Sequence, residues 1–351
     1  MSELEQEIVT PRTNTWLLGL EEEERFLLNA WKNNTLHNSL LISGIEGIGK
    51  ATLAYRFARF LLSADYSRKD EYTSLNVSAD STVFKLVSNG SHPDMKVLER
   101  DYTETDRKKI MKAIKDGEQL SQEEMQGLKK SAYIRIDDVR TVNEFLSKRS
   151  SGDGWRVVII DSIDDMNTAS ANAILKILEE PPHKTLMMLI SHNPNRLSPT
   201  IRSRCAKINL HPLSENNVAS LLRRYRTGLS EKDVKSIAAI SSGSIGKAIS
   251  YADNNALSVY NDLSKIISAG SRFSTADVMA FASAYSTEET YELAKELILK
   301  FIAENIRKTQ HVEELADAWN DAVKTFSETE GLNLDKKQAL MNIIVNIAKR
   351  I

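Results

Sequence analysis

The chain has 351 residues, of which 41% are hydrophobic and 27% charged, and its formal net charge is −2. This length allows two or three domains with a large core, and the composition is that of a globular protein. The balanced charge argues against a protein that grips nucleic acid by electrostatics alone. No apolar run is long enough to span a bilayer. The single cysteine, Cys205, excludes an intrachain disulfide and a cysteine-based zinc site, which suits a cytoplasmic protein.

The first 210 residues predict strands and helices in alternation. Continuous apolar runs predict buried strands at 40–42, 95–98, 155–161, 185–191 and 206–210. Helical spacing of apolar residues predicts helices at 21–31, about 50–62, 134–147 and 166–180. Residues 63–90 indicate a polar surface excursion, and the charge-rich stretch 99–130 indicates a solvated helical or flexible insertion. This order of elements predicts a parallel α/β sheet.

The pattern changes after residue 210, because no further strand is predicted. Residues 215–225, 232–241 and 244–252 have the spacing of short helices, and 256–351 that of longer amphipathic ones. The sequence therefore predicts three domains. These are an α/β domain at 1–210 carrying the insertion near 99–130, a small helical domain at 211–254 and an all-α domain at 255–351.

The stretch 40–62, LLISGIEGIGKATLAYRFARFLL, has the pattern of a phosphate-binding loop. A strand, a glycine-rich turn and a helix follow one another there. Glycines let the backbone N–H groups point inward, the helix N-terminus adds partial positive charge, and a lysine reaches the outer phosphates. The alternative is a glycine-rich turn without a ligand. The candidate residues for binding ATP or ADP are Gly44, Gly47, Gly49, Lys50 and Thr52.

Two positions around this loop depart from the pattern of an active ATPase. Ala51 stands where a serine or threonine hydroxyl normally binds Mg²⁺, and Thr52 lies about 100° further round the helix. Asp161 ends an apolar strand and suits the water-mediated metal contact, so it completes the candidate nucleotide site. Ser162 follows it, where a glutamate usually orients the attacking water. We therefore expect little hydrolysis at this site.

The run 172–205, NAILKILEEPPHKTLMMLISHNPNRLSPTIRSRC, resembles the matching stretch of clamp-loader AAA+ subunits. Its LEEPP and SRC sequences are similar to signatures of the bacterial γ/τ and δ′ subunits. Segments 37–62, 92–94 and 155–167 resemble the δ′ subunits of bacterial DNA polymerase III in particular. The resemblance covers most of 15–250, while the remaining third agrees only in being helical. It implies an AAA+ domain, a helical lid domain and an all-α collar domain.

The resemblance also implies a role for the SRC sequence, Ser203, Arg204 and Cys205. In that family the arginine projects across a subunit interface to the γ-phosphate of ATP bound by a γ/τ neighbour, where a guanidinium stabilises the transferring phosphoryl group. The implied partners are γ/τ and δ subunits and, through the complex, the β sliding clamp and primed DNA. The chain would then be part of a DNA-directed DNA polymerase holoenzyme without being catalytic alone. The alternative for Arg204 is a surface arginine in a basic turn.

Further departures from active members of the family agree with this interpretation. Gly246 stands where working ATPases carry an arginine that touches the nucleotide, with Lys247 beside it. The sensor position falls on Ser191, His192 or Asn193. The four-cysteine zinc module of many relatives is missing, so no metal and no zinc is predicted. Two other functions stay open: an active γ/τ-type ATPase, and a small-molecule P-loop kinase that would leave SRC and LEEPP unexplained.

Overall fold

The computed structural model describes residues 10–116, 124, 127–148, 154–306 and 312–350. These residues form two compact units. The first comprises Met1–Tyr225 and Ser241–Lys247, and the second Arg226–Ile240 and Ala248–Ile351. The division into three domains at 210 and 254 stays a prediction.

The first unit is built on one five-stranded sheet in the order β2-β3-β4-β1-β5, and all of its strand pairs are parallel. The strands are β1 (Ser39–Ser43), β2 (Met95–Glu99), β3 (Arg156–Asp161), β4 (Thr185–Ser191) and β5 (Ala206–Asn209). All residues of β1 and β4 are buried, as expected for central strands covered on both faces. The predicted parallel α/β sheet is confirmed.

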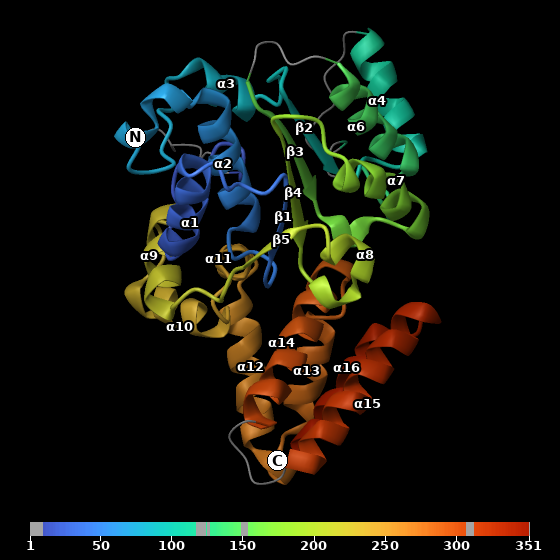
Figure 1. Cartoon of the computed structure of the whole chain (residues 1–351). Helices are drawn as coiled ribbons and strands as arrows, with labels where there is room; N and C mark the ends of the chain where they lie inside the picture. Colours follow the sequence, from blue (N-terminus) through green and yellow to red (C-terminus); the bar gives the residue numbers. More distant parts are fainter. Residues whose placement is uncertain (1–9, 117–123, 125–126, 149–153, 307–311, 351) are drawn as a thin grey trace. The chain divides into compact units, whose positions relative to one another are not determined.

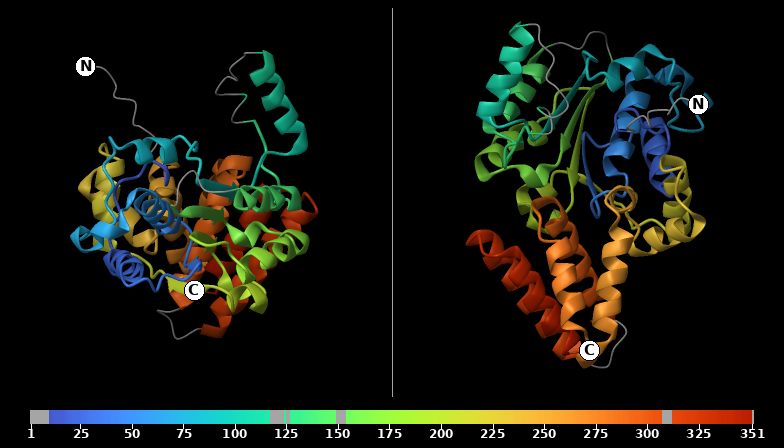
Figure 2. Two further views of the ribbon diagram at one scale, coloured as in Figure 1. Left: turned by 45° about the horizontal axis from the view of Figure 1, so that its top comes forward. Right: turned by 180° about the vertical axis from the view of Figure 1, so that it is seen from behind.

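Helices cover both faces of this sheet. Its helices are α1 (Glu21–Lys32), α2 (Lys50–Ser63), α3 (Thr82–Ser88), α4 (Glu104–Asp116), α6 (Ile136–Ser147), α7 (Thr168–Glu179), α8 (Pro199–Arg202) and α9 (Glu215–Tyr225). Figures 1 and 2 show α1, α2 and α3 on one side of the sheet and α6 and α7 on the other. The 3-10 elements of this unit are η1 (Tyr66–Glu71), η2 (Ile163–Asp165) and η3 (Pro194–Arg196).

Two segments differ in detail from the sequence-based expectation. The excursion at 63–90 contains η1 and α3 rather than irregular chain alone. Ser81 caps α3 by accepting a hydrogen bond from the backbone of Phe84, and Phe84 and Val87 are buried. Seven residues are too few to show a helical period, which is why the pattern missed this helix. In the insertion, α4 confirms a helical part at 104–116, while 117–123 and 125–126 lie outside the described residues.

The second unit contains only helices among its described residues. They are α10 (Glu231–Ile240), α12 (Ala256–Ser268), η4 (Gly270–Arg272), α13 (Thr275–Ala284), α14 (Glu288–Ile306), α15 (Val312–Gly331) and α16 (Lys336–Ala348), together with most of α11 (Ile245–Asp253). α14 packs against α12 and α15, and α16 against α13 and α15. Fully buried side chains such as Leu263, Ile302 and Ile344 form its core. The predicted all-α C-terminal region is confirmed.

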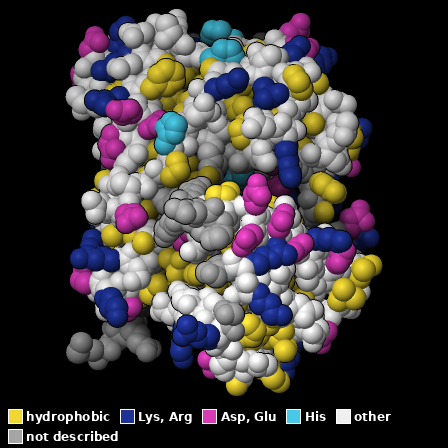
Figure 3. Space-filling view, turned by 90° about the horizontal axis from the view of Figure 1, so that it is seen from below, with side chains coloured by type: hydrophobic (Ala, Val, Ile, Leu, Met, Phe, Trp, Pro, Cys, Tyr) yellow, Lys and Arg dark blue, Asp and Glu magenta, His cyan; other side chains and the backbone are white. Residues whose placement is uncertain are grey.

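Surface charge is mixed on the face of the molecule that Figure 3 presents. Lysines and arginines there are interspersed with aspartates and glutamates rather than gathered by sign. This distribution agrees with the net charge of −2. Within the described residues, no helix is both long enough and apolar enough to cross a membrane.

Candidate functional site

The phosphate-loop sequence lies between β1 and α2, as predicted. Gly44, Gly47 and Gly49 have φ angles of +149°, +76° and +106°, which side chains with a Cβ rarely adopt. A Cβ on Gly44 would lie 2.7 Å from the carbonyl oxygen of Leu210, a backbone atom that cannot rotate away. The loop therefore requires its glycines. It leads into the N-terminus of α2, where helices in general attract phosphate groups through their first backbone N–H groups.

The loop lysine turns back on its own loop. Lys50 is only 4% exposed, and its Nζ donates to the carbonyl oxygens of Gly44 at 2.6 Å and Ile45 at 2.7 Å. Burial lowers the pKa of Lys50 to about 8, and the nearby carboxylates of Asp161 and Glu46 oppose that shift. The lysine therefore stabilises the loop in this conformation through hydrogen bonds to two carbonyl groups.

This buried lysine predicts a pH-dependent stability. The pKa of Lys50 is about 8 in the folded chain against 10.5 for a free lysine, so the folded chain binds fewer protons between these values. Above about pH 10.5 Lys50 is neutral in both the folded and the unfolded chain, and its burial then carries no charge penalty. This stability is lost as the pH falls through about 8, where the buried lysine becomes charged. Urea unfolding of wild type and Lys50→Met at about pH 7.5 and about pH 10 measures this. The unfolding free energy of wild type minus that of Lys50→Met should be larger at the higher pH. An equal difference at both pH values would contradict the predicted effect of Lys50.

A segment almost 200 residues further along the chain contacts the same loop. The backbone N–H of Gly246 donates to the carbonyl of Gly47 at 2.8 Å, and the hydroxyl of Ser244 donates to the carbonyl of Glu46 at 2.8 Å. A Cβ on Gly246 would lie 2.8 Å from the Cα of Gly47. The glycine at the position of the expected arginine therefore allows direct backbone contact, and this arrangement leaves no room there for a side chain.

Ala51 and Ser162 stand at the positions where an active ATPase binds Mg²⁺ and orients the attacking water. Ala51 offers a methyl group in the first turn of α2, and Thr52 is buried one residue further on. Asp161 ends β3, and burial raises its pKa. Ser162 is buried beside it. The loop residues therefore fit phosphate, but the direct magnesium ligand and the catalytic carboxylate of an ATPase are replaced. In the described part of the chain, no group of three or more His, Cys, Asp or Glu side chains could hold a metal ion.

One carboxylate near this site, which the sequence indicated only as one of a pair of acids at a helix N-terminus, makes a contact that the sequence did not predict. Asp164 lies in η2, and its Oδ1 accepts a hydrogen bond from the Ser191 hydroxyl at 2.9 Å. The backbone N–H of His192 donates to its second oxygen. Asp164 therefore joins the end of β4 to the segment after β3. Its two partners, Ser191 and His192, are two of the three candidate sensor positions. The third, Asn193, precedes η3. No sequence pattern signals this contact, because 27 residues separate Asp164 from Ser191.

The SRC sequence presents its arginine beside a groove. Ser203 is exposed, Arg204 is 32% exposed, and Cys205 is buried, with a pKa raised by burial to about 11. The Nη2 of Arg204 lies 2.7 Å from Oε1 of Glu179, and its Nη1 donates to the carbonyl of Thr200 at 2.9 Å. The groove has a volume of about 810 Å³, and its lining includes Thr35, His37, Pro181, Ser203, Glu179 and Arg204. Arg204 is therefore accessible from outside the fold, and Cys205 serves as a core residue.

Comparison with known proteins adds an independent observation. The model of a family described as DNA polymerase III, delta subunit, matches residues 19–214, which is more than half of the chain. The chain belongs to this delta-subunit family. The match includes the phosphate loop, Asp161 and the SRC sequence, and it ends before the segment at 244–247 that contacts the loop.

The curated relatives of the chain include DNA polymerase III subunits named delta' and tau/gamma. The chain is 32% identical over 170 residues to DNA polymerase III subunit delta' of Pseudomonas aeruginosa, covering 48% of this chain and 42% of that protein. It is 27% identical over 234 residues to subunit delta' of Escherichia coli K12, covering 67% and 60%. It is 25% identical over 247 residues to subunit tau/gamma of Haemophilus influenzae, covering 69% and 31%. The matches span less than two thirds of each relative's own length. The predicted resemblance to δ′ clamp-loader subunits is confirmed.

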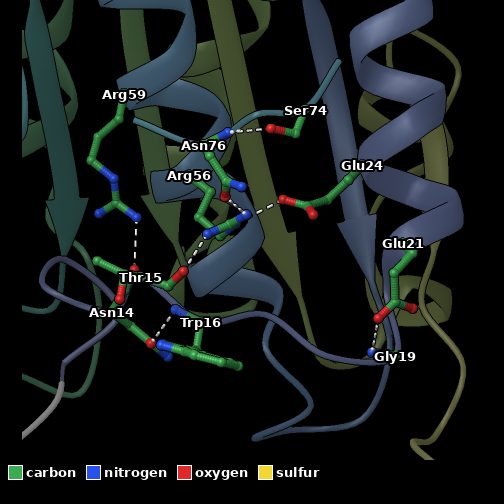
Figure 4. A network of polar contacts seen from close by, with 10 residues as sticks. All are labelled: Asn14, Thr15, Trp16, Gly19, Glu21, Glu24, Arg56, Arg59, Ser74 and Asn76. Carbon is green, nitrogen blue, oxygen red and sulfur yellow. Dashed lines mark hydrogen bonds and ion pairs between the residues drawn. The ribbon is translucent and has the colours of Figure 1, made fainter. Parts of the chain in front are cut away.

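Two buried arginines on α2, the helix after the phosphate loop, bind the segment that precedes α1 (Figure 4). Arg56 on α2 donates to the Glu24 carboxylate at 2.7 Å and to the carbonyl of Thr15 at 2.5 Å. Arg59, one turn later, donates to the carbonyl of Asn14 at 2.7 Å. Because buried guanidinium groups must find acceptors, these bonds hold residues 14 and 15 along α2.

Proposed function

We propose that the chain is a δ′ stator subunit of a bacterial clamp loader. It assembles with γ/τ and δ subunits in the cytoplasm and helps to load the β sliding clamp onto primed DNA. It supplies Arg204 to the ATP site of a neighbouring γ/τ subunit, with little or no hydrolysis of its own. Its part in the polymerase holoenzyme is then structural and regulatory, and its all-α region at 255–351 joins the collar of the assembly.

The observation that carries this proposal is the contrast between Arg204 and Lys50, the two basic residues that could meet a triphosphate. Arg204 is accessible beside a groove, whereas Lys50 is buried and bonded to its own loop. An exposed guanidinium delivered to a neighbour's triphosphate offsets the negative charge that develops as the phosphoryl group transfers. Relatives named delta' support the assignment.

The chain's own loop supports binding of phosphate rather than its hydrolysis. Ala51 cannot coordinate Mg²⁺, Ser162 cannot act as a base at neutral pH, and Gly246 brings no arginine to the nucleotide. Each missing group typically contributes orders of magnitude in rate. ATP or ADP in this loop would be held by the three glycines and Lys50 once the lysine leaves the carbonyls it now binds.

An active γ/τ-type ATPase is the second candidate, since a tau/gamma subunit is among the relatives. ATP turnover by the purified chain separates the two functions. We expect negligible turnover by the chain alone, and co-purification with γ/τ and δ subunits in a complex that hydrolyses ATP. Rapid turnover by the isolated chain, with Lys50→Ala abolishing it, would favour the second candidate. Failure to co-purify with either partner would contradict the clamp-loader assignment.

A further inference from the structure

The partly exposed Arg204 is held by a carboxylate from α7. Glu179 is the last residue of α7, and its Oε1 lies 2.7 Å from the Nη2 of Arg204. The carbonyl of Thr200 in α8 accepts from Nη1 at 2.9 Å. The guanidinium is therefore fixed at two points from two elements. Its five N–H donors lie in one plane, so fixing two nitrogens sets the direction of the remaining ones.

The position of Glu179 is not explained by the stability of its helix. A helix ends in partial negative charge, so a carboxylate in the last turn of α7 is unfavourable by itself. The ion pair with Arg204 offsets this repulsion. Pro181 follows two residues later and cannot continue the helix, which fixes where Glu179 is presented.

The same pair lines the groove beside the SRC sequence. Glu179 and Arg204 both belong to its lining, together with residues 34–38 before β1 and Ser39 at its start. Glu179 is 48% exposed and Arg204 32% exposed, so the pair is accessible to solvent and weak. A weak pair orients a long side chain and still yields it to a phosphate group, which binds a guanidinium more strongly than one exposed carboxylate does.

We propose that Glu179 is a positioning residue for Arg204, holding its guanidinium toward the groove until a neighbour's triphosphate binds. The inference rests on the proposed trans role of Arg204. Glu179 itself touches no reacting group and acts only through the arginine. Removing it leaves the Thr200 carbonyl as the remaining acceptor for the guanidinium. The long side chain then samples more rotamers, so fewer encounters present the guanidinium correctly.

The test uses the complete loader rebuilt with γ/τ and δ subunits. Glu179→Ala should lower kcat for ATP at the adjoining site about 5- to 10-fold with KM changed less than about 2-fold, because the lost interaction acts on the transition state. Glu179→Gln should recover part of the rate, since its amide oxygen still accepts a hydrogen bond. Glu180→Ala, at the next residue, which is also exposed, is the matched control and should behave as wild type.

A double variant distinguishes positioning from an unrelated effect. Glu179→Ala combined with Arg204→Ala should be no slower than Arg204→Ala alone, because residues that act as a unit are not additive. A rate for Glu179→Ala equal to that of Glu180→Ala, or a double variant slower than Arg204→Ala by the full factor, would overturn the positioning role. If Arg204→Ala itself were silent, the trans role would fall instead, so the two failures are distinguishable.

Discussion

Replacing Arg204 with alanine is expected to lower ATP turnover at the adjoining site of a rebuilt clamp loader by at least about 100-fold. A guanidinium that enters a neighbour's triphosphate site stabilises charge that exists only in the transition state, so its loss should appear in kcat. The side chain of Arg204 is 32% exposed, and its ion pair with Glu179 is accessible to solvent, so a triphosphate group can replace the carboxylate. Steady-state turnover of loaders carrying wild-type or variant chain measures the effect.

Arg196→Ala is the matched control for that experiment. Arg196 is an exposed arginine eight residues before Arg204, in η3, and it does not line the groove. It should leave turnover unchanged while removing the same charge. Co-purification of both variants with γ/τ and δ subunits shows that assembly is intact. Equal turnover by wild type, Arg196→Ala and Arg204→Ala in assembled loaders would contradict the trans role.

Local sequence patterns predicted the parts of the fold that local chemistry determines. Continuous apolar runs mark β1 and β4 because both faces of these strands are buried. The glycines at 44, 47 and 49 mark the loop because only glycine adopts their φ angles readily. The short polar stretch between two predicted strands indicated that Arg204 could be presented outside the fold, and its side chain is 32% exposed.

Contacts between distant residues could not be predicted in the same way. The bond from Gly246 to Gly47, and the bonds that join Asp164 to Ser191 and His192, depend on how the chain folds back on itself. The sequence showed a glycine in place of an arginine at 246, but not that the loop backbone touches it. These contacts have no periodicity, because each is a single meeting of two segments far apart in sequence.

A methyl group at position 246 is expected to disrupt the contact on the phosphate loop. The added Cβ of Gly246→Ala would lie 2.8 Å from the Cα of Gly47, and backbone atoms cannot move aside by rotating. Overpacking of this kind costs about 1–3 kcal/mol, which exceeds the fraction of a kcal/mol that alanine gains over glycine near a helix start. The segment 244–247 should therefore leave the loop more often.

Hydrogen exchange at residues 44–50 measures that opening, since a local contact can be lost without unfolding the rest of the chain. A loss of about 1–3 kcal/mol corresponds to exchange about 5- to 150-fold faster. Gly228→Ala is the control, because an added Cβ there has no heavy atom within 4 Å, and its exchange should match that of wild type. Equal protection of the loop in Gly246→Ala and Gly228→Ala would mean that the contact does not stabilise the loop. Faster exchange confined to Gly246→Ala would show that the contact between Gly246 and Gly47 stabilises the loop that Lys50 binds.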